Sequence, residues 1–153
     1  MQVVVSDYIP TNMTSDLPVL LAAVSILSAL HLTFQARRVG WSRMKHKIMP
    51  PTVTGPPEFE RTFRAHQNGV ELYSIFLVVL WISGIFCNEV LAALGGLLYI
   101  VGREIYFTGY IHESKKRLPG FYLVLCALFF LTVVATIGII QSFLDKYLNN
   151  GLL

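Results

Sequence analysis

The sequence predicts an all-α integral membrane protein whose fold is a bundle of four transmembrane helices. Of its 153 residues, 54% are hydrophobic and only 14% are charged, which is outside the usual range of soluble domains. Four apolar segments approach the ~20 residues that a helix needs to cross a bilayer. For segments of this length, only a helix can satisfy all of the backbone hydrogen bonds inside the lipid. We expect residues 1–153 to form a single four-helix membrane domain.

The helices are expected at about residues 17–46, 57–86, 90–112 and 119–146. Two Pro-Pro pairs, Pro50-Pro51 and Pro56-Pro57, separate the first helix from the second. Because proline cannot continue a helix, this segment predicts a stiff loop. A very short turn near Asn88-Glu89 joins the second helix to the third, and residues 113–120 join the third to the fourth.

Basic residues gather on one side of the predicted membrane. Eleven of the twelve Lys and Arg residues flank the first loop or lie in the third helix and the loop after it, and Lys146 is on the other side. The positive-inside rule therefore places both loops in the cytosol and both termini across the membrane. The glycosylation sequon Asn12-Met13-Thr14 falls on the far side. Because the basic residues flank apolar spans, nucleic-acid binding is not expected.

Polar residues converge at the cytosolic end of the second helix. At 100° per residue, one narrow arc carries Arg61, Arg64, Asn68 and Glu71. Ionisable groups that enter a bilayer are costly, so they need a partner, a wet cavity or a ligand. Two guanidinium groups, an amide and a carboxylate on one face could hold a small zwitterion that bears carboxylates and an amine.

Two further groups are expected to face this arc. Offsets of four, three and four residues form one stripe on the third helix: Tyr99, Arg103, Tyr106 and Tyr110. The basic loop after that helix ends in Arg117, and Arg43 lies at the end of the first helix. So many polar groups at one depth exceed what packing needs, which favours a binding site.

Structural roles are open alternatives for parts of this set. Arg64 and Glu71 could form an internal ion pair, and Arg103 could pair with Glu71 or Glu104. Tyrosines at helix ends commonly form an interface belt. A channel or transporter is disfavoured because the polar groups stay at one end of the bundle. The cysteines lack the neighbours of a metal site, so no metal is expected.

Residues 56–68 with Glu71, and residues 99–110, resemble the MAPEG family of membrane-associated proteins in eicosanoid and glutathione metabolism. The likeness covers about residues 18–148. Residues 20–28 and 142–147 are most similar to the type-2 glutathione transferase branch, with the leukotriene C synthase branch next. Leu72 and Ser74 depart from the family pattern, in which an aromatic residue and a proline stand there.

The resemblance implies a homotrimer with a glutathione site between neighbouring subunits. It assigns Arg117 as the catalytic residue that holds the thiolate. The implied glutathione-binding residues are Arg64, His66, Asn68, Glu71, Tyr106 and Tyr110, with Arg43 contributed by the adjacent subunit. Supporting roles are expected for Arg61, Arg103 and Tyr99.

The expected function is that of a transferase of the endoplasmic reticulum or nuclear envelope, with its active site facing the cytosol. It would conjugate glutathione, as co-substrate, to lipophilic electrophiles, including leukotriene A epoxide to give leukotriene C. Glutathione peroxidase activity toward lipid hydroperoxides is a further expectation. A lipid substrate would arrive from the bilayer between the first and fourth helices. The alternative is a non-catalytic fatty-acid-binding scaffold of the five-lipoxygenase-activating type, a branch that lacks the arginine set of Arg64 and Arg117.

Overall fold

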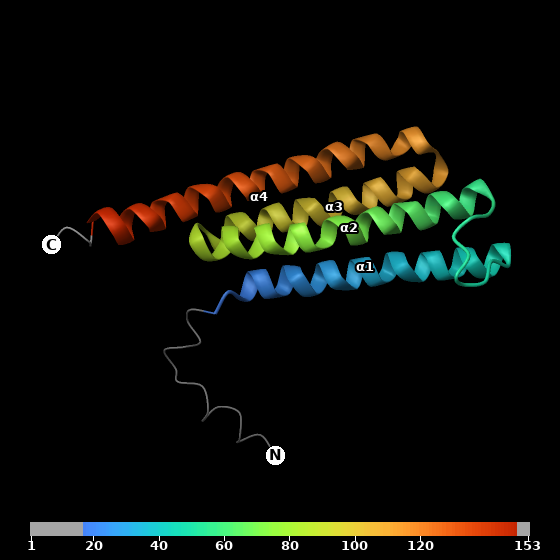
Figure 1. The fold of residues 1–153 in the computed structure, drawn as a ribbon, viewed down its shortest axis with the longest axis horizontal. Helices are drawn as coiled ribbons and strands as arrows, with labels where there is room; N and C mark the ends of the chain where they lie inside the picture. The colour runs from blue at the N-terminus through green and yellow to red at the C-terminus, as the bar shows by residue number, and fades with distance from the viewer. Residues whose placement is uncertain (1–16, 150–153) are drawn as a thin grey trace, which may run out of the picture.

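The computed structural model describes residues 17–149, and this part of the chain forms one bundle of four long helices (Figure 1). They are α1 (Val19–His46), α2 (Pro57–Phe86), α3 (Glu89–His112) and α4 (Leu118–Leu144), with the 3-10 turn η1 (Ser114–Arg117) before α4 and the π-helical turn η2 (Asp145–Asn149) after it. Each of the four long helices is long and apolar enough to cross a membrane. The predicted all-α membrane class is therefore confirmed, whereas the Asn12 sequon lies outside the described residues.

The helix ends follow from local sequence signals. Pro57 stands at the start of α2, where its missing N–H costs nothing. The side chain of Asn88 caps α3 by accepting a hydrogen bond from the Leu91 amide at 2.9 Å. At the end of α1, Lys47 adopts the left-handed conformation with φ 56°. The helix α1 begins at Val19 rather than at residue 17, because Pro18 occupies its N-cap.

The helices α2 and α3 form the centre of the bundle, with α1 at one edge and α4 at the other (Figure 1). The α1–α2 loop and the α3–α4 link lie at the same end of the bundle, which we call the loop end. The turn between α2 and α3 lies at the opposite end, as do the start of α1 and the end of α4. Of the four helices, α3 has the most buried residues. A side chain on α3 can therefore meet partners from all three of the others.

Close contact between α3 and α4 depends on glycine. A Cβ atom added at Gly120 would meet the backbone of α3, with the Cα of Tyr106 at 2.5 Å and the carbonyl oxygen of Gly102 at 2.8 Å. Small residues at such a seam let membrane helices approach closely. Deeper in the bundle, the Phe76 and Tyr99 rings stack with centroids 3.9 Å apart.

Polar contacts hold α1 against α3. The Glu104 carboxylate accepts a hydrogen bond from Arg38 at 3.0 Å and lies 3.0 Å from the ring nitrogen of His31. Gln35, which is almost fully buried, lies 3.4 Å from the backbone oxygen of Arg103. Glu104 thus pairs with α1, and the alternative in which it pairs with Arg103 is not what the structure shows.

The two positions that depart from the family pattern leave α2 unbroken. Leu72 is partly buried and packs against the central apolar cluster. Ser74 is exposed on the helix surface. Since α2 runs continuously from Pro57 to Phe86, a proline at position 74 is not needed to place the polar residues that precede it.

Candidate functional site

An open cavity of about 220 Å³ lies between α2, α3 and η1 in the loop-end half of the bundle. Its lining residues are Arg64, Gln67, Asn68, Glu71, Tyr106, Tyr110 and Arg117. Six of these were predicted from the sequence, and Gln67 was missed. The signal for Gln67 was available, because it lies three residues after Arg64 and four before Glu71 on the same helix face.

Asn68 is held in one orientation by Arg103. The buried Arg103 guanidinium donates to the Asn68 Oδ1 at 2.8 Å and to the Ala65 carbonyl oxygen at 3.0 Å. Gly69 makes room for this group, since a Cβ there would lie 2.8 Å from the Arg103 Nη2. With its oxygen already bonded, the Asn68 amide offers its N–H₂ group to the cavity, so it would act as a donor toward an anionic ligand.

The Arg117 side chain, just before the start of α4, lies above an aromatic ring. Its guanidinium lies 4.6 Å from the centroid of the Tyr110 ring, and Tyr110 packs edge-on against Tyr106 at 5.7 Å. A cation over a tyrosine face is stabilised without losing its charge. The arrangement therefore presents a permanent positive charge to the cavity from η1, whereas Arg64 and Glu71 line it from α2.

Arg64 and Glu71 are exposed on the α2 side of the cavity. Within residues 17–149, neither side chain has a hydrogen bond or an ion pair, so the alternative of an internal Arg64–Glu71 pair is not what the structure shows. One cation and one anion that lie about two helical turns apart can contact two oppositely charged groups of the same small ligand.

Besides Arg103 and Arg43, three predicted residues do not line this cavity. Arg61 donates through Nε to the Ile111 carbonyl oxygen at 3.0 Å and lines a separate cavity. His66 lies about 200° around α2 from Arg64, and its buried Nδ1 has no hydrogen-bond partner among the described residues. Tyr99 is buried about 10 Å deeper along α3 than Tyr106 and packs in the core.

Arg43 also lies elsewhere in the same chain. It donates to the Thr52 carbonyl oxygen at 2.6 Å, and its guanidinium lies 5.1 Å from the Phe59 ring centroid. It lines a groove at the end of α1 with residues of the following loop. One copy of the chain therefore does not bring Arg43 to the cavity of Arg64 and Arg117.

The expected route for a lipid between the first and fourth helices does not exist within one copy of the chain. The helices α1 and α4 lie at opposite edges of the bundle, with α2 and α3 between them (Figure 1). The expected route therefore requires α1 and α4 of different subunits, and it stays a prediction.

The described residues thus form a four-helix membrane bundle with an open, charged cavity in its loop-end half. The chain belongs to the MAPEG family, whose model matches residues 21–137. The resemblance of residues 56–68 and 99–110 to that family is thereby confirmed.

Three relatives give this membership more detail. Human microsomal glutathione S-transferase 2 is 53% identical over 131 residues, which cover 86% of this chain and 89% of that protein. The mouse protein of the same name is 53% identical over 130 residues, covering 85% and 88%. Bovine leukotriene C4 synthase is 40% identical over 134 residues, covering 88% and 89%. The order of similarity agrees with the one expected from the sequence.

Proposed function

We propose that this protein is a membrane-bound glutathione transferase that joins the glutathione thiolate to lipophilic electrophiles. The observation that carries the proposal is the single cavity shared by Arg64, Asn68, Glu71 and Arg117 with two tyrosines. Relatives covering most of the chain are named as a glutathione transferase and a leukotriene C4 synthase, which supports an enzyme. No metal is needed for this chemistry, since the nucleophile belongs to glutathione.

Arg117 would activate the thiol. A free thiol has a pKa of about 8.5, so little thiolate exists at neutral pH. Lowering that pKa by about two units requires roughly 2.7 kcal/mol of stabilisation for the anion. One guanidinium at ~4 Å supplies about 4 kcal/mol at an effective dielectric constant of ~20. A single arginine is therefore sufficient, and Arg117 is the cation that already faces the cavity from η1.

The α2 wall would hold the peptide. Arg64 and the Asn68 amide N–H₂ group would bind carboxylates, while Glu71 would bind the amine of the γ-glutamyl residue. Fixing both ends of the tripeptide places the sulfur near Arg117, and this positioning itself lowers the barrier. The thiolate then attacks an epoxide carbon; the C–S bond forms, the C–O bond breaks, and the resulting alkoxide takes a proton from water.

We further propose a homotrimer in which neighbouring subunits share the site. At about 220 Å³, the cavity is smaller than the ~300–1,000 Å³ typical of ligand sites. A second copy that supplies Arg43 would close its open side. In such an assembly α1 of one subunit could meet α4 of the next, and a lipid substrate could arrive between them.

The preferred substrates and the cellular location belong to the same proposal. Leukotriene A epoxide, giving leukotriene C, is the proposed lipid substrate because one of the relatives carries the name of that synthase. Peroxidase activity toward lipid hydroperoxides would use the same thiolate. The concentration of basic residues at the loop end supports a site that faces the cytosol from the endoplasmic reticulum or nuclear envelope.

The test measures thiolate formation and conjugation by the purified protein. Wild type, Arg117→Ala and the control Lys115→Ala would be compared with an activated arene and with leukotriene A. Lys115 is an exposed cation on the same turn that does not line the cavity. For a two-unit pKa shift, Arg117→Ala should hold roughly 25-fold less thiolate at pH 7, and the deficit should nearly vanish at about pH 9.

The possible outcomes test the enzymatic activity of the protein and the role of Arg117 separately. A wild-type protein that forms neither thiolate nor conjugate, but binds fatty acids, would favour the non-catalytic scaffold. A loss of activity in Arg117→Ala that is the same at every pH would show that Arg117 supports the structure and does not stabilise the thiolate.

A further inference from the structure

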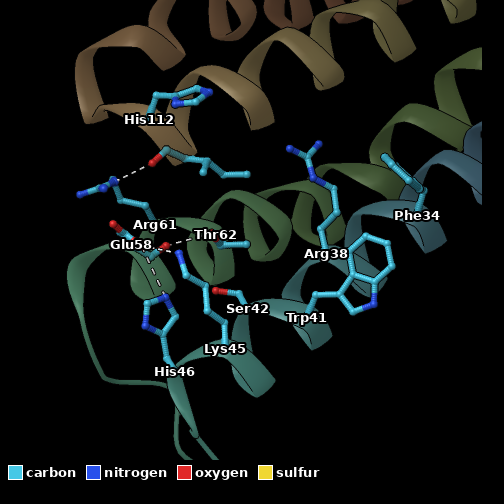
Figure 2. Close-up of a pocket in the computed structure, with 11 residues that line it drawn as sticks. Phe34, Arg38, Trp41, Ser42, Lys45, His46, Glu58, Arg61, Thr62 and His112 are labelled. Atoms are coloured by element: carbon cyan, nitrogen blue, oxygen red, sulfur yellow. Dashed lines mark hydrogen bonds and ion pairs between the residues drawn. The ribbon is translucent and has the colours of Figure 1, made fainter.

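A second cavity, of about 550 Å³, lies at the loop end between the last turns of α1, the first turns of α2 and the end of α3 (Figure 2). Its volume is within the ~300–1,000 Å³ range of ligand sites. None of the described residues that line it borders the smaller cavity of Arg64 and Arg117. It is therefore separate from the proposed glutathione site.

The walls of this second cavity carry more positive than negative charge. Arg38, Lys45 and Arg61 line it as permanent cations, and Glu58 is the one carboxylate among its described lining residues. The imidazole of His112 also lines the cavity. An anion would be attracted here, where the local surroundings are less polar than bulk water.

Part of this positive charge is already paired inside the protein. Glu58 lies 3.1 Å from the Lys45 Nζ and 3.6 Å from the His46 ring, while Arg38 binds Glu104 outside the cavity. Arg61 uses only its Nε, which donates to the Ile111 carbonyl oxygen. Within the described part of the chain, the two terminal amino groups of Arg61 have no hydrogen-bond partner, and such a pair suits a phosphate oxygen fork.

Apolar side chains form the other side of the cavity. Figure 2 shows Phe34 and Trp41 on the side away from Lys45 and Glu58, together with Arg38, whose charge is paired with Glu104. Phe34 precedes the end of α1 by twelve residues, or about 18 Å along the helix. The cavity thus runs from charged groups at the helix ends toward apolar groups nearer the bilayer, as an amphiphile requires.

We propose that this cavity binds the phosphate headgroup of an anionic phospholipid. The unused terminal amino groups of Arg61 would bind the phosphate, and Lys45, which keeps Glu58 as a neighbour at 3.1 Å, would add a second cation beside it. The acyl chains would leave past Trp41 and Phe34. Basic pockets between transmembrane helices on the cytosolic side are suited to such headgroups, because anionic lipids concentrate in that leaflet. The proposal does not depend on the assignment of glutathione to the other cavity.

The test measures lipid binding to the full-length protein after its lipids have been exchanged for neutral detergent. Native mass spectrometry would give dissociation constants for dioctanoyl phosphatidate and dioctanoyl phosphatidylcholine, with inorganic phosphate added as a competitor. Phosphatidate should bind more tightly than phosphatidylcholine, and millimolar phosphate should displace it only weakly.

Variants locate the site. At roughly fivefold per charge, Lys45→Gln/Arg61→Gln should weaken phosphatidate binding about 25-fold. Lys45→Gln alone, at an exposed position, should weaken it about fivefold, and it keeps the test valid if the double variant does not fold. Lys47→Gln removes an exposed cation that does not line this cavity, so it should bind as wild type does.

Four results would overturn the proposal. Equal binding of the two lipids would mean that the charges play no part. Wild-type binding in both Lys45 variants would place the lipid elsewhere. Inorganic phosphate that binds as tightly as phosphatidate would indicate a soluble ligand. A double variant that changes its oligomeric state but not its lipid binding would make the cavity a subunit contact.

Discussion

The replacement of Arg103 by lysine tests whether a buried arginine orients the proposed glutathione site. Arg103 bonds Asn68 and Ala65 through two different terminal nitrogens, at 2.8 and 3.0 Å. Lysine keeps the charge but lacks the planar fork, so it can satisfy only one of these acceptors at good geometry. A hydrogen bond from a charged donor contributes about 1.5–3 kcal/mol, and its loss would free the Asn68 amide to rotate.

The expected result is a change in glutathione affinity with little change in turnover. If half of the lost hydrogen-bond energy had served to orient Asn68, about 0.8–1.5 kcal/mol of ligand binding would be lost, which is roughly a four- to thirteenfold rise in the KM for glutathione. Arg117 lies on η1 and is not bonded to Arg103, so kcat at saturating glutathione should stay within about twofold.

A double-mutant cycle tests whether Arg103 affects the KM for glutathione through Asn68. Asn68→Ala alone should raise KM by a similar factor, and Arg103→Lys/Asn68→Ala should be no worse than Asn68→Ala. Effects that multiply would show that Arg103 acts independently of Asn68 and would refute the reasoning. An unchanged KM in a folded Arg103→Lys protein would refute it as well. Thermal unfolding in detergent is the control for folding.

Two other predictions concern helix packing and shared sites. Gly120→Ala should destabilise the protein by about 1–3 kcal/mol, because its Cβ meets the α3 backbone at Tyr106. In the matched control, Gly40→Ala inside α1, the new Cβ meets nothing within 4 Å. Its thermal unfolding temperature in detergent should stay the same or rise slightly, because alanine favours a helix interior over glycine by up to about 1 kcal/mol. If two subunits share the site, the Arg43→Ala and Arg64→Ala proteins should each be nearly inactive when expressed alone. Their co-expression should restore part of the conjugation activity, because Arg64 of one variant and Arg43 of the other would complete one site. No recovery of activity would argue against a shared site.

Local periodicity made much of the fold and part of the site predictable. The four spans depend on apolar run length, and the loop of residues 47–56 depends on its prolines. Arg64, Asn68 and Glu71 share one face because helix geometry fixes their angular positions whatever surrounds them. The stripe of Tyr106 and Tyr110 on α3 was predictable for the same reason.

The family resemblance extended that prediction beyond periodicity. The residues alone grouped Arg117 with the α2 arc, and the resemblance assigned it the catalytic role; the structure places Arg117 and the α2 residues around one cavity. The resemblance also included His66, which helix geometry turns to the other side of α2. The contribution of Arg43 depends on a second subunit, so neither the sequence pattern nor one chain is enough to establish it.

The sequence by itself determined which residues are polar, at what depth they lie and which face of a helix carries them. The tertiary structure decided which side chains contact each other. Glu104 pairs with Arg38, Arg103 donates a hydrogen bond to Asn68, and the Arg117 guanidinium lies over the Tyr110 ring. These pairings depend on the rotation and axial shift of one helix against another. Those shifts are set by close packing at positions such as Gly120, which a pattern within a single helix does not encode.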